Sequence, residues 1–352
     1  MKYLIQWMML SFVFVQCQYP VSISSLPETE KFLIIDAQVT QDYAAINVYY
    51  SLDEVTSKGA YTLPQPPKSV AYLLDDKGER FDFKNTLGIA DTTFKGKVGN
   101  SYQLFIEANG QVYTSSKETM RPSPKLDSVV VLYTREQFRS PSDLPYDGFD
   151  VYAQANDIPG VENYYQWSWV HYEKASSCNK IFSRAEGREV LQPCVPPECW
   201  NIVYNQKVII QQDKQRDGQP LTQKVVRVPY ANPPKQYYIQ VEQRAITPLV
   251  FEYLRSLEST TENLGTLFDI PPQTRFNPNV FNQSDPSEKL LGVFSVFSYE
   301  KKIIYIDLDS PIAGATQKVI SDPTPFVGDP FSVAPCIEGQ FRTKIKPKGW
   351  IF

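Results

Sequence analysis

Apolar side chains alternate with polar ones along most of this chain, and this period of two limits its fold more than any other feature. Ile46, Val48 and Tyr50 alternate in one run, and Val70 and Tyr72 begin another. Alternation is typical of strands that bury one face, whereas an amphipathic helix needs a period of about 3.6 residues. Abundant aromatic and β-branched residues favour strands as well. The chain is therefore predicted to be mainly β.

Two turn signals define a first domain. The segment Asp75–Gly78 separates two alternating runs, and so does the pair Asn109 and Gly110. Asn-Gly supplies two residues that tolerate positive φ, as a tight hairpin turn requires. Residues 30–120 are therefore predicted to form an immunoglobulin-like or fibronectin-like β-sandwich. Residues 121–126, which carry two prolines, are predicted to form a stiff linker.

Residues 127–352 are predicted to form a second β-sandwich of the same kind, with long loops, because a chain of 352 residues is long enough for two domains. Its expected strands lie around Val129–Leu132, Tyr165–Trp169, Val208–Ile210, Tyr237–Val241, Val293–Phe297 and Ile303–Ile306. An inserted helix is expected at about 247–263. Thr247 can cap it, Pro248 suits its first position, and Val250 begins an apolar stripe at helical spacing.

The N-terminus predicts export. A short positive start precedes an apolar run that ends at Val15, well short of the roughly 20 residues that a spanning helix needs. Residues 1–16 are predicted to be a lipoprotein-type signal peptide, Cys17 the lipid attachment point, and residues 17–29 a tether, although the residue before the cysteine is not small. Cleavage after the small-x-small triplet that ends at Ser24 is the alternative, and it would discard Cys17.

Four further cysteines predict two disulfides, because an even number in an exported chain is typical of a disulfide framework. They are Cys178, Cys194, Cys199 and Cys336. Three connectivities are possible, and spacing does not choose among them. A metal site is the alternative, but no CxxC pair is present and His171 lies outside usual zinc spacing from Cys178. No metal and no cofactor are expected.

Charge and motif content disfavour several functions. The net charge is −4 with acidic and basic residues interspersed, so no basic stripe suits nucleic acid. His171 is the single histidine and is interpreted as structural or surface-exposed, and GxSxG, HExxH and a phosphate-binding glycine loop are absent. The Asp75-Asp76 pair is interpreted as turn chemistry, and Asp307 with Asp309 offers part of a calcium shell. No catalytic residues are predicted, and the chain is expected not to be an enzyme.

Three aromatic residues form the leading candidate for a ligand platform. Tyr165, Trp167 and Trp169 alternate, so their rings would lie along one face of a strand and could stack on a sugar or an aromatic ligand. The alternative is ordinary packing in the core of a sandwich.

A long, proline-rich and polar stretch around residues 270–286 is the candidate partner loop, because partner contacts concentrate on long loops. Its candidate residues are Pro272, Asn277, Asn279 and Asn282. The alternative is a passive crossover packed against its own domain. Near the C-terminus, basic residues alternate and predict either one basic strand face or an edge strand protected by lysines; they are Arg342, Lys344, Lys346 and Lys348.

Motifs in a specific order run through both halves of the chain. They are Phe32–Thr40, Phe94–Tyr113, Pro122–Val129, Tyr165–Trp167, Cys199-Trp200, Phe251–Leu254, Leu264–Asp269, Asn279–Asn282, Leu291–Phe294, and a tail with Cys336, Lys346-Pro347 and Trp350. In this order the chain resembles the Bacteroidota outer-membrane lipoproteins of the domain of unknown function 4249 family, over nearly the whole mature chain. Pro278 departs from the glycine usual in the family. A second tail cysteine is missing, which leaves Cys194 or Cys199 as candidates to pair with Cys336.

The resemblance implies a lipoprotein of the outer membrane, lipid-anchored and facing the cell surface or the periplasm. It also implies an accessory role beside a TonB-dependent outer-membrane β-barrel. The leading hypothesis is therefore a non-enzymatic accessory or binding subunit of such a complex. A free-standing module that binds glycan or peptide is the alternative. A hydrolase with an unfamiliar site is a third hypothesis, which close carboxylates in a pocket would favour.

Overall fold

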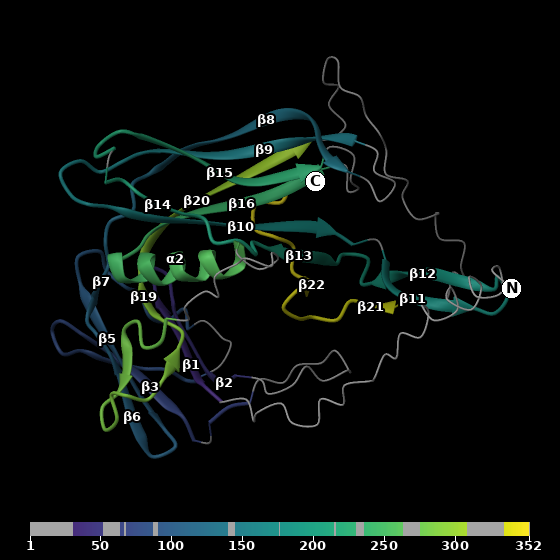
Figure 1. Ribbon diagram of the computed structural model, residues 1–352. Coiled ribbons are helices and arrows are strands. Elements are labelled where there is room, and N and C mark those ends of the chain that lie inside the picture. Colours follow the sequence, from purple (N-terminus) through teal and green to yellow (C-terminus); the bar gives the residue numbers. More distant parts are fainter. Residues whose placement is uncertain are drawn as a thin grey trace, which may run out of the picture.

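The fold is mainly β, as predicted. It is seen in a computed structural model that describes residues 31–51, 64–66, 68–86, 91–139, 145–175, 177–214, 216–229, 236–262, 275–307 and 334–351. Two sandwich-like pairs of sheets lie on either side of the helix α2 (Pro248–Glu262), and a small fifth sheet projects from one end (Figure 1). No helix in these ranges is long and apolar enough to cross a bilayer.

The first sandwich combines a four-stranded and a six-stranded sheet. In the smaller sheet, β1 (Leu33–Val39) pairs with β2 (Ala44–Tyr50), β18 (Leu290–Leu291) and β19 (Phe294–Val296). The larger sheet has the order β17 (Val280–Asn282), β6 (Gln111–Ser115), β5 (Ser101–Ala108), β3 (Val70–Asp75) and β4 (Arg80–Asp82), with β7 (Glu118–Thr119) also on β5. The alternating apolar residues of β1 are buried between the sheets, as their spacing predicts.

This first sandwich includes a segment from far along the chain. Strands β17, β18 and β19 belong to the part predicted to lie in the second domain, yet β1 pairs in parallel with both β18 and β19. Val280 and Phe294 are buried in the same core as β1. The predicted boundary of 127–352 is therefore wrong for this segment. The physical reason is that β2 pairs with only one edge of β1, and the backbone groups of the other edge pair with β18 and β19.

The second sandwich encloses its own core. One sheet has the order β20 (Ser298–Asp307), β16 (Gln236–Ala245), β10 (Tyr164–Lys174), β13 (Trp200–Tyr204) and β22 (Arg342–Thr343), with β14 (Ile210–Gln212) also on β10. The facing sheet has the order β15 (Pro220–Pro229), β9 (Pro145–Asn156) and β8 (Leu126–Arg139). Buried side chains from both sheets form one cluster, so these strands pack as two layers.

Helix α2 begins where the sequence predicts. The Thr247 side chain accepts a hydrogen bond from the backbone N–H of Val250 at 3.5 Å, and Pro248 occupies the first helical position. Val250 and Phe251 are buried in a cluster that also contains Phe297. The helix thereby packs its apolar side between the two sandwiches.

Polar contacts also join the two sandwiches. The Gln41 side chain donates to the backbone carbonyl of Tyr299 at 2.7 Å and accepts from its N–H at 3.2 Å. In the predicted linker, the N–H of Ser123 donates to the hydroxyl of Ser298 at 2.7 Å. The linker is thus held against β20 rather than acting as a free spacer.

Candidate functional site

Two disulfides link the segments near the fifth sheet. Cys178 pairs with Cys194, and Cys199 pairs with Cys336, with sequence separations of 16 and 137. The prediction of two disulfides is confirmed, and of the two partners that the family resemblance left open for Cys336 the structure selects Cys199. The sulfur atoms lie close enough to suggest a metal cluster, but a sulfur in a disulfide is not the thiolate that a zinc ion binds.

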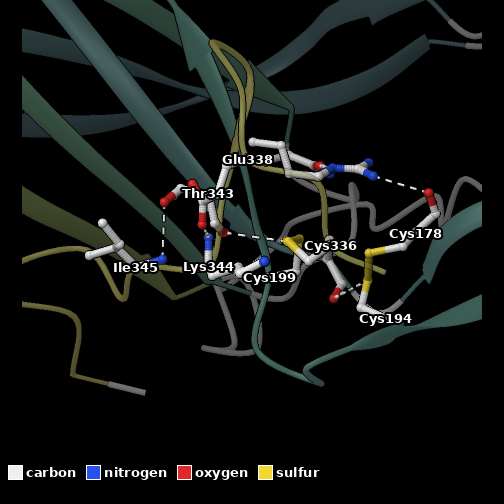
Figure 2. Close-up of a disulfide and its surroundings, with 11 residues drawn as sticks. Cys178, Cys194, Cys199, Cys336, Glu338, Thr343, Lys344 and Ile345 are labelled. Carbon is white, nitrogen blue, oxygen red and sulfur yellow. Dashed lines mark hydrogen bonds between the residues drawn. A yellow bond between two sulfur atoms is a disulfide. The ribbon is translucent and has the colours of Figure 1, made fainter. Parts of the chain in front are cut away.

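The fifth sheet positions these bonds. Strands β11 (Ser177–Ser183) and β12 (Arg188–Val195) form a hairpin, and β21 (Ala334–Pro335) pairs in parallel with β12. The N–H of Cys336 donates to the carbonyl of Val195 at 2.9 Å. Arg342 donates to the carbonyl of Cys178 at 3.1 Å and to the side chain of Asn201 at 3.0 Å. Figure 2 shows how the two disulfides and the tail around Thr343 and Lys344 gather in one place.

The predicted aromatic platform is wrong as a set of three exposed rings. Tyr165 is 0% exposed and Trp167 is 1% exposed, both inside the core of the second sandwich. The Tyr165 hydroxyl donates to Asp157, and the indole N–H of Trp167 donates to Gln243 at 3.2 Å. The alternative, packing in the core of a sandwich, is what the structure shows for these two rings. Trp169 differs, because it is only partly buried at the edge of that core.

A cavity of about 760 Å³ lies beside Trp169. Its walls come from the chain around β14 and from β15, which among the described strands pairs only with β9. The register of β15 shifts between Lys224 and Val226, a bulge at the cavity wall. Apolar and polar groups both line the cavity, among them Trp169, Ile209, Val226, Lys207, Gln223 and Glu258. A concave site of this size can hold a small ligand or a short peptide.

Three carboxylates converge near the start of β10, one from just after β9 and two from the segment between β14 and β15. Oxygen atoms of Asp157, Asp213 and Asp217 lie within 4.8 Å of one another. Asp157 accepts from the N–H of Gly218 at 2.8 Å, and Asp213 accepts from that of Asn163 at 2.9 Å. Burial raises the pKa of Asp213. Carboxylate oxygens suit calcium, so this set could hold a cation. Its hydrogen bonds to Gly218 and Asn163 also connect the segments on which the carboxylates lie. Sequence spacing gave no signal for the set.

The described residues of the predicted partner loop pack into the first sandwich. The Asn279 side chain is buried, donates to the carbonyl of Phe294 at 2.7 Å and accepts from its N–H at 2.9 Å. Asn282 is buried as well and donates to Glu288 at 2.6 Å. Asn277 accepts from the N–H of Leu290 at 2.6 Å. The prediction of partner contacts is wrong for Asn279 and Asn282, because both amides satisfy buried backbone or side-chain groups.

Of the other predicted residues, some have the role that the sequence predicts and some lie outside the described parts of the chain. His171 is buried, with Nδ1 2.7 Å from the carbonyl of Tyr238 and Nε2 3.0 Å from a Glu173 oxygen, which confirms a structural role. Asp75 accepts from two backbone N–H groups of its turn, as predicted. Cys17 and the remaining leader and tether residues, together with Pro272 and Asp309, lie outside the described residues.

Comparison with known proteins gives one positive result. A family model with the description Domain of unknown function (DUF4249) matches residues 18–303. Neither the curated proteins nor the solved structures contain a match.

Proposed function

Since this chain belongs to the family of domain of unknown function 4249, we propose that it is an exported, lipid-anchored protein of the outer membrane. In this proposal it serves as a non-enzymatic accessory or binding subunit of a TonB-dependent transporter or another outer-membrane β-barrel complex. Cys17 carries the acyl chains, and residues 17–29 tether the two sandwiches to the membrane, with the protein facing the cell surface or the periplasm.

The two disulfides are the observation that carries the proposal. Disulfides persist in oxidising compartments and are rare in the cytosol. Cys199 and Cys336 are 0% and 1% exposed, so their disulfide lies in a buried cluster and not on the surface. Their presence supports export, which a lipoprotein anchored through Cys17 requires.

The fixed arrangement of the two sandwiches supports a role in binding a partner. Helix α2, the Gln41–Tyr299 hydrogen bonds and the Ser123–Ser298 bond fix the two sandwiches against each other. A rigid pair of domains can present fixed surfaces to a larger complex at little cost in conformational entropy. Acylation adds about 0.8 kcal/mol for each buried CH₂ group, so two or more chains would anchor such a scaffold stably.

Native isolation in mild detergent, followed by mass spectrometry, tests the proposal in one experiment. We expect an outer-membrane barrel to be recovered with the chain, an acylated Cys17 as the first residue, and two disulfides. The Cys17→Ala variant should leave the membrane fraction. Recovery of the intact protein without any barrel would contradict the accessory role, and a mature N-terminus after Ser24 would contradict the lipid anchor.

The cavity beside Trp169 supports a second candidate, a module that binds glycan or peptide. Oligosaccharides and peptides should bind to the purified protein in isothermal titration calorimetry, and Trp169→Ala should abolish the binding while the fold is retained. Phe281→Ala is the matched control, since Phe281 is a partly exposed ring on the other sandwich. Equal loss of binding in both variants would argue against the cavity as the site.

A further inference from the structure

The tail of the chain exposes large apolar side chains. We define the C-terminal loop as residues 336–348. Its Ile337, Phe341 and Ile345 are 71%, 62% and 74% exposed. Among the described residues, the five most exposed large apolar side chains are these three together with Phe182 of β11 and Ile351 at the end of the tail. Monomeric proteins rarely gather such side chains in one region unless it contacts something.

The C-terminal loop is held in this exposed arrangement from several sides. Cys336 bonds covalently to Cys199, and the Gly339 and Arg342 backbones form a bridge. Glu338 accepts from the N–H of Lys344 at 2.6 Å, and the N–H of Ile345 donates to the hydroxyl of Thr343 at 3.0 Å (Figure 2). Because the backbone is fixed at these points, the apolar side chains do not turn inward by a simple collapse of the loop.

Cations flank the exposed apolar residues. Lys344, Lys346 and Lys348 are exposed, and in the described part of the chain none of them forms an ion pair. Arg342 differs, because it bonds to the carbonyl of Cys178 and the side chain of Asn201. Four cations against the single carboxylate of Glu338 give the loop a charge of +3, within a chain whose net charge is −4. The predicted basic strand face ends early, because β22 stops at Thr343.

We propose that the C-terminal loop is a membrane-contact surface for a bilayer that contains anionic phospholipid. Ile337, Phe341 and Ile345 enter the headgroup region, and the three exposed lysines bind the anionic headgroups. Apolar burial and electrostatic attraction add in contacts of this kind, and each lysine near an anionic surface strengthens binding about fivefold. The inference goes beyond the proposed lipid anchor, since it uses no residue of the first 30.

The test uses residues 18–352, without an acyl chain. Every described contact lies within residues 31–351, so this form keeps the whole described fold. Its co-sedimentation is measured with vesicles of phosphatidylcholine alone and with vesicles that also contain phosphatidylglycerol. We expect binding to the anionic vesicles only, weakened by salt. The combined change of Lys344, Lys346 and Lys348 to glutamine should weaken it by roughly a hundredfold, and Ile337, Phe341 and Ile345 changed to serine should abolish it.

Matched controls change exposed residues on the first sandwich. Lys77, Lys97 and Lys117 to glutamine control for charge, and Val70 with Val98 to serine control for apolar exposure. Both should bind as the unchanged protein does, and circular dichroism should be the same for all variants. Equal binding to neutral vesicles, or loop variants that bind like the controls, would overturn the proposal. So would absence of vesicle binding together with a barrel protein retained through this loop, an outcome that leaves the accessory role intact.

Discussion

The disulfide between Cys199 and Cys336 allows the sharpest test of what holds the second half of the chain together. It closes a loop with a sequence separation of 137, whereas Cys178–Cys194 closes one of 16. The perturbation is the replacement of Cys199 and Cys336 by alanine. The matched control replaces Cys178 and Cys194, which lie in the same module and carry the same chemistry.

The expected magnitudes follow from chain entropy. A cross-link restricts the unfolded chain by an amount that grows with the logarithm of loop length. For the separations of 137 and 16, this predicts losses in the free energy of unfolding of about 5 and about 3 kcal/mol. The long-range bond should therefore matter more by about 2 kcal/mol.

Urea denaturation of the oxidised proteins, followed by tryptophan fluorescence, measures the free energy of unfolding of both variants. Mass spectrometry confirms that the remaining disulfide is formed in each. The loop-closure reasoning fails if the Cys178 and Cys194 variant is destabilised as much as the Cys199 and Cys336 variant, or more.

Four further substitutions test other parts of the fold. Gly292→Ala should lower the free energy of unfolding by more than about 3 kcal/mol, because its Cβ would lie 2.2 Å from the carbonyl oxygen of Ile35. Gly99→Ala, at a similar φ with open space, should lower it by about 1 kcal/mol in the same urea assay. Asn279→Ala should lower it by about 3 kcal/mol, since it leaves buried backbone groups without partners; a loss under about 1 kcal/mol would contradict that role. Hydrogen bonds and charge from Arg227 and a neighbouring lysine hold the pKa of Asp150 below its usual value, so its stabilisation is present at neutral pH and is lost as the pH falls below about 4. The free energy of unfolding, measured across acidic pH, should fall less steeply in the Asp150→Asn variant than in the unchanged protein. Identical pH profiles of the two proteins would refute this role of Asp150.

Local patterns allowed much of the fold to be predicted. The turn at Asn109 and Gly110 has φ values of 53° and 73°, as the Asn-Gly pair predicts. The start of α2 was predicted from Thr247 and Pro248, and the number of disulfides from the even count of cysteines. Each of these features depends on residues adjacent in sequence or on simple counting, so one sequence suffices.

Features that join distant segments could not be predicted in this way. Nothing in the alternation of β1 specifies Leu290 or Phe294 as its parallel neighbours, because any apolar strand would satisfy the same pattern. The same limit applies to Trp167 and Trp169. Both occupy one face of β10 in the sequence pattern, but only their distance from the sandwich edge decides that one ring is core and the other lines a cavity. The acidic set of Asp157 and Asp213 likewise depends on tertiary packing.

The long-range closure of the first sandwich also imposes an order in time. A chain made from its N-terminus completes β1 and β2 early, but the second edge of β1 stays open until residues 290–296 have emerged. Until then an apolar strand with free backbone groups is available to pair with other chains. A chain truncated before Leu290 should therefore aggregate rather than yield a stable first domain.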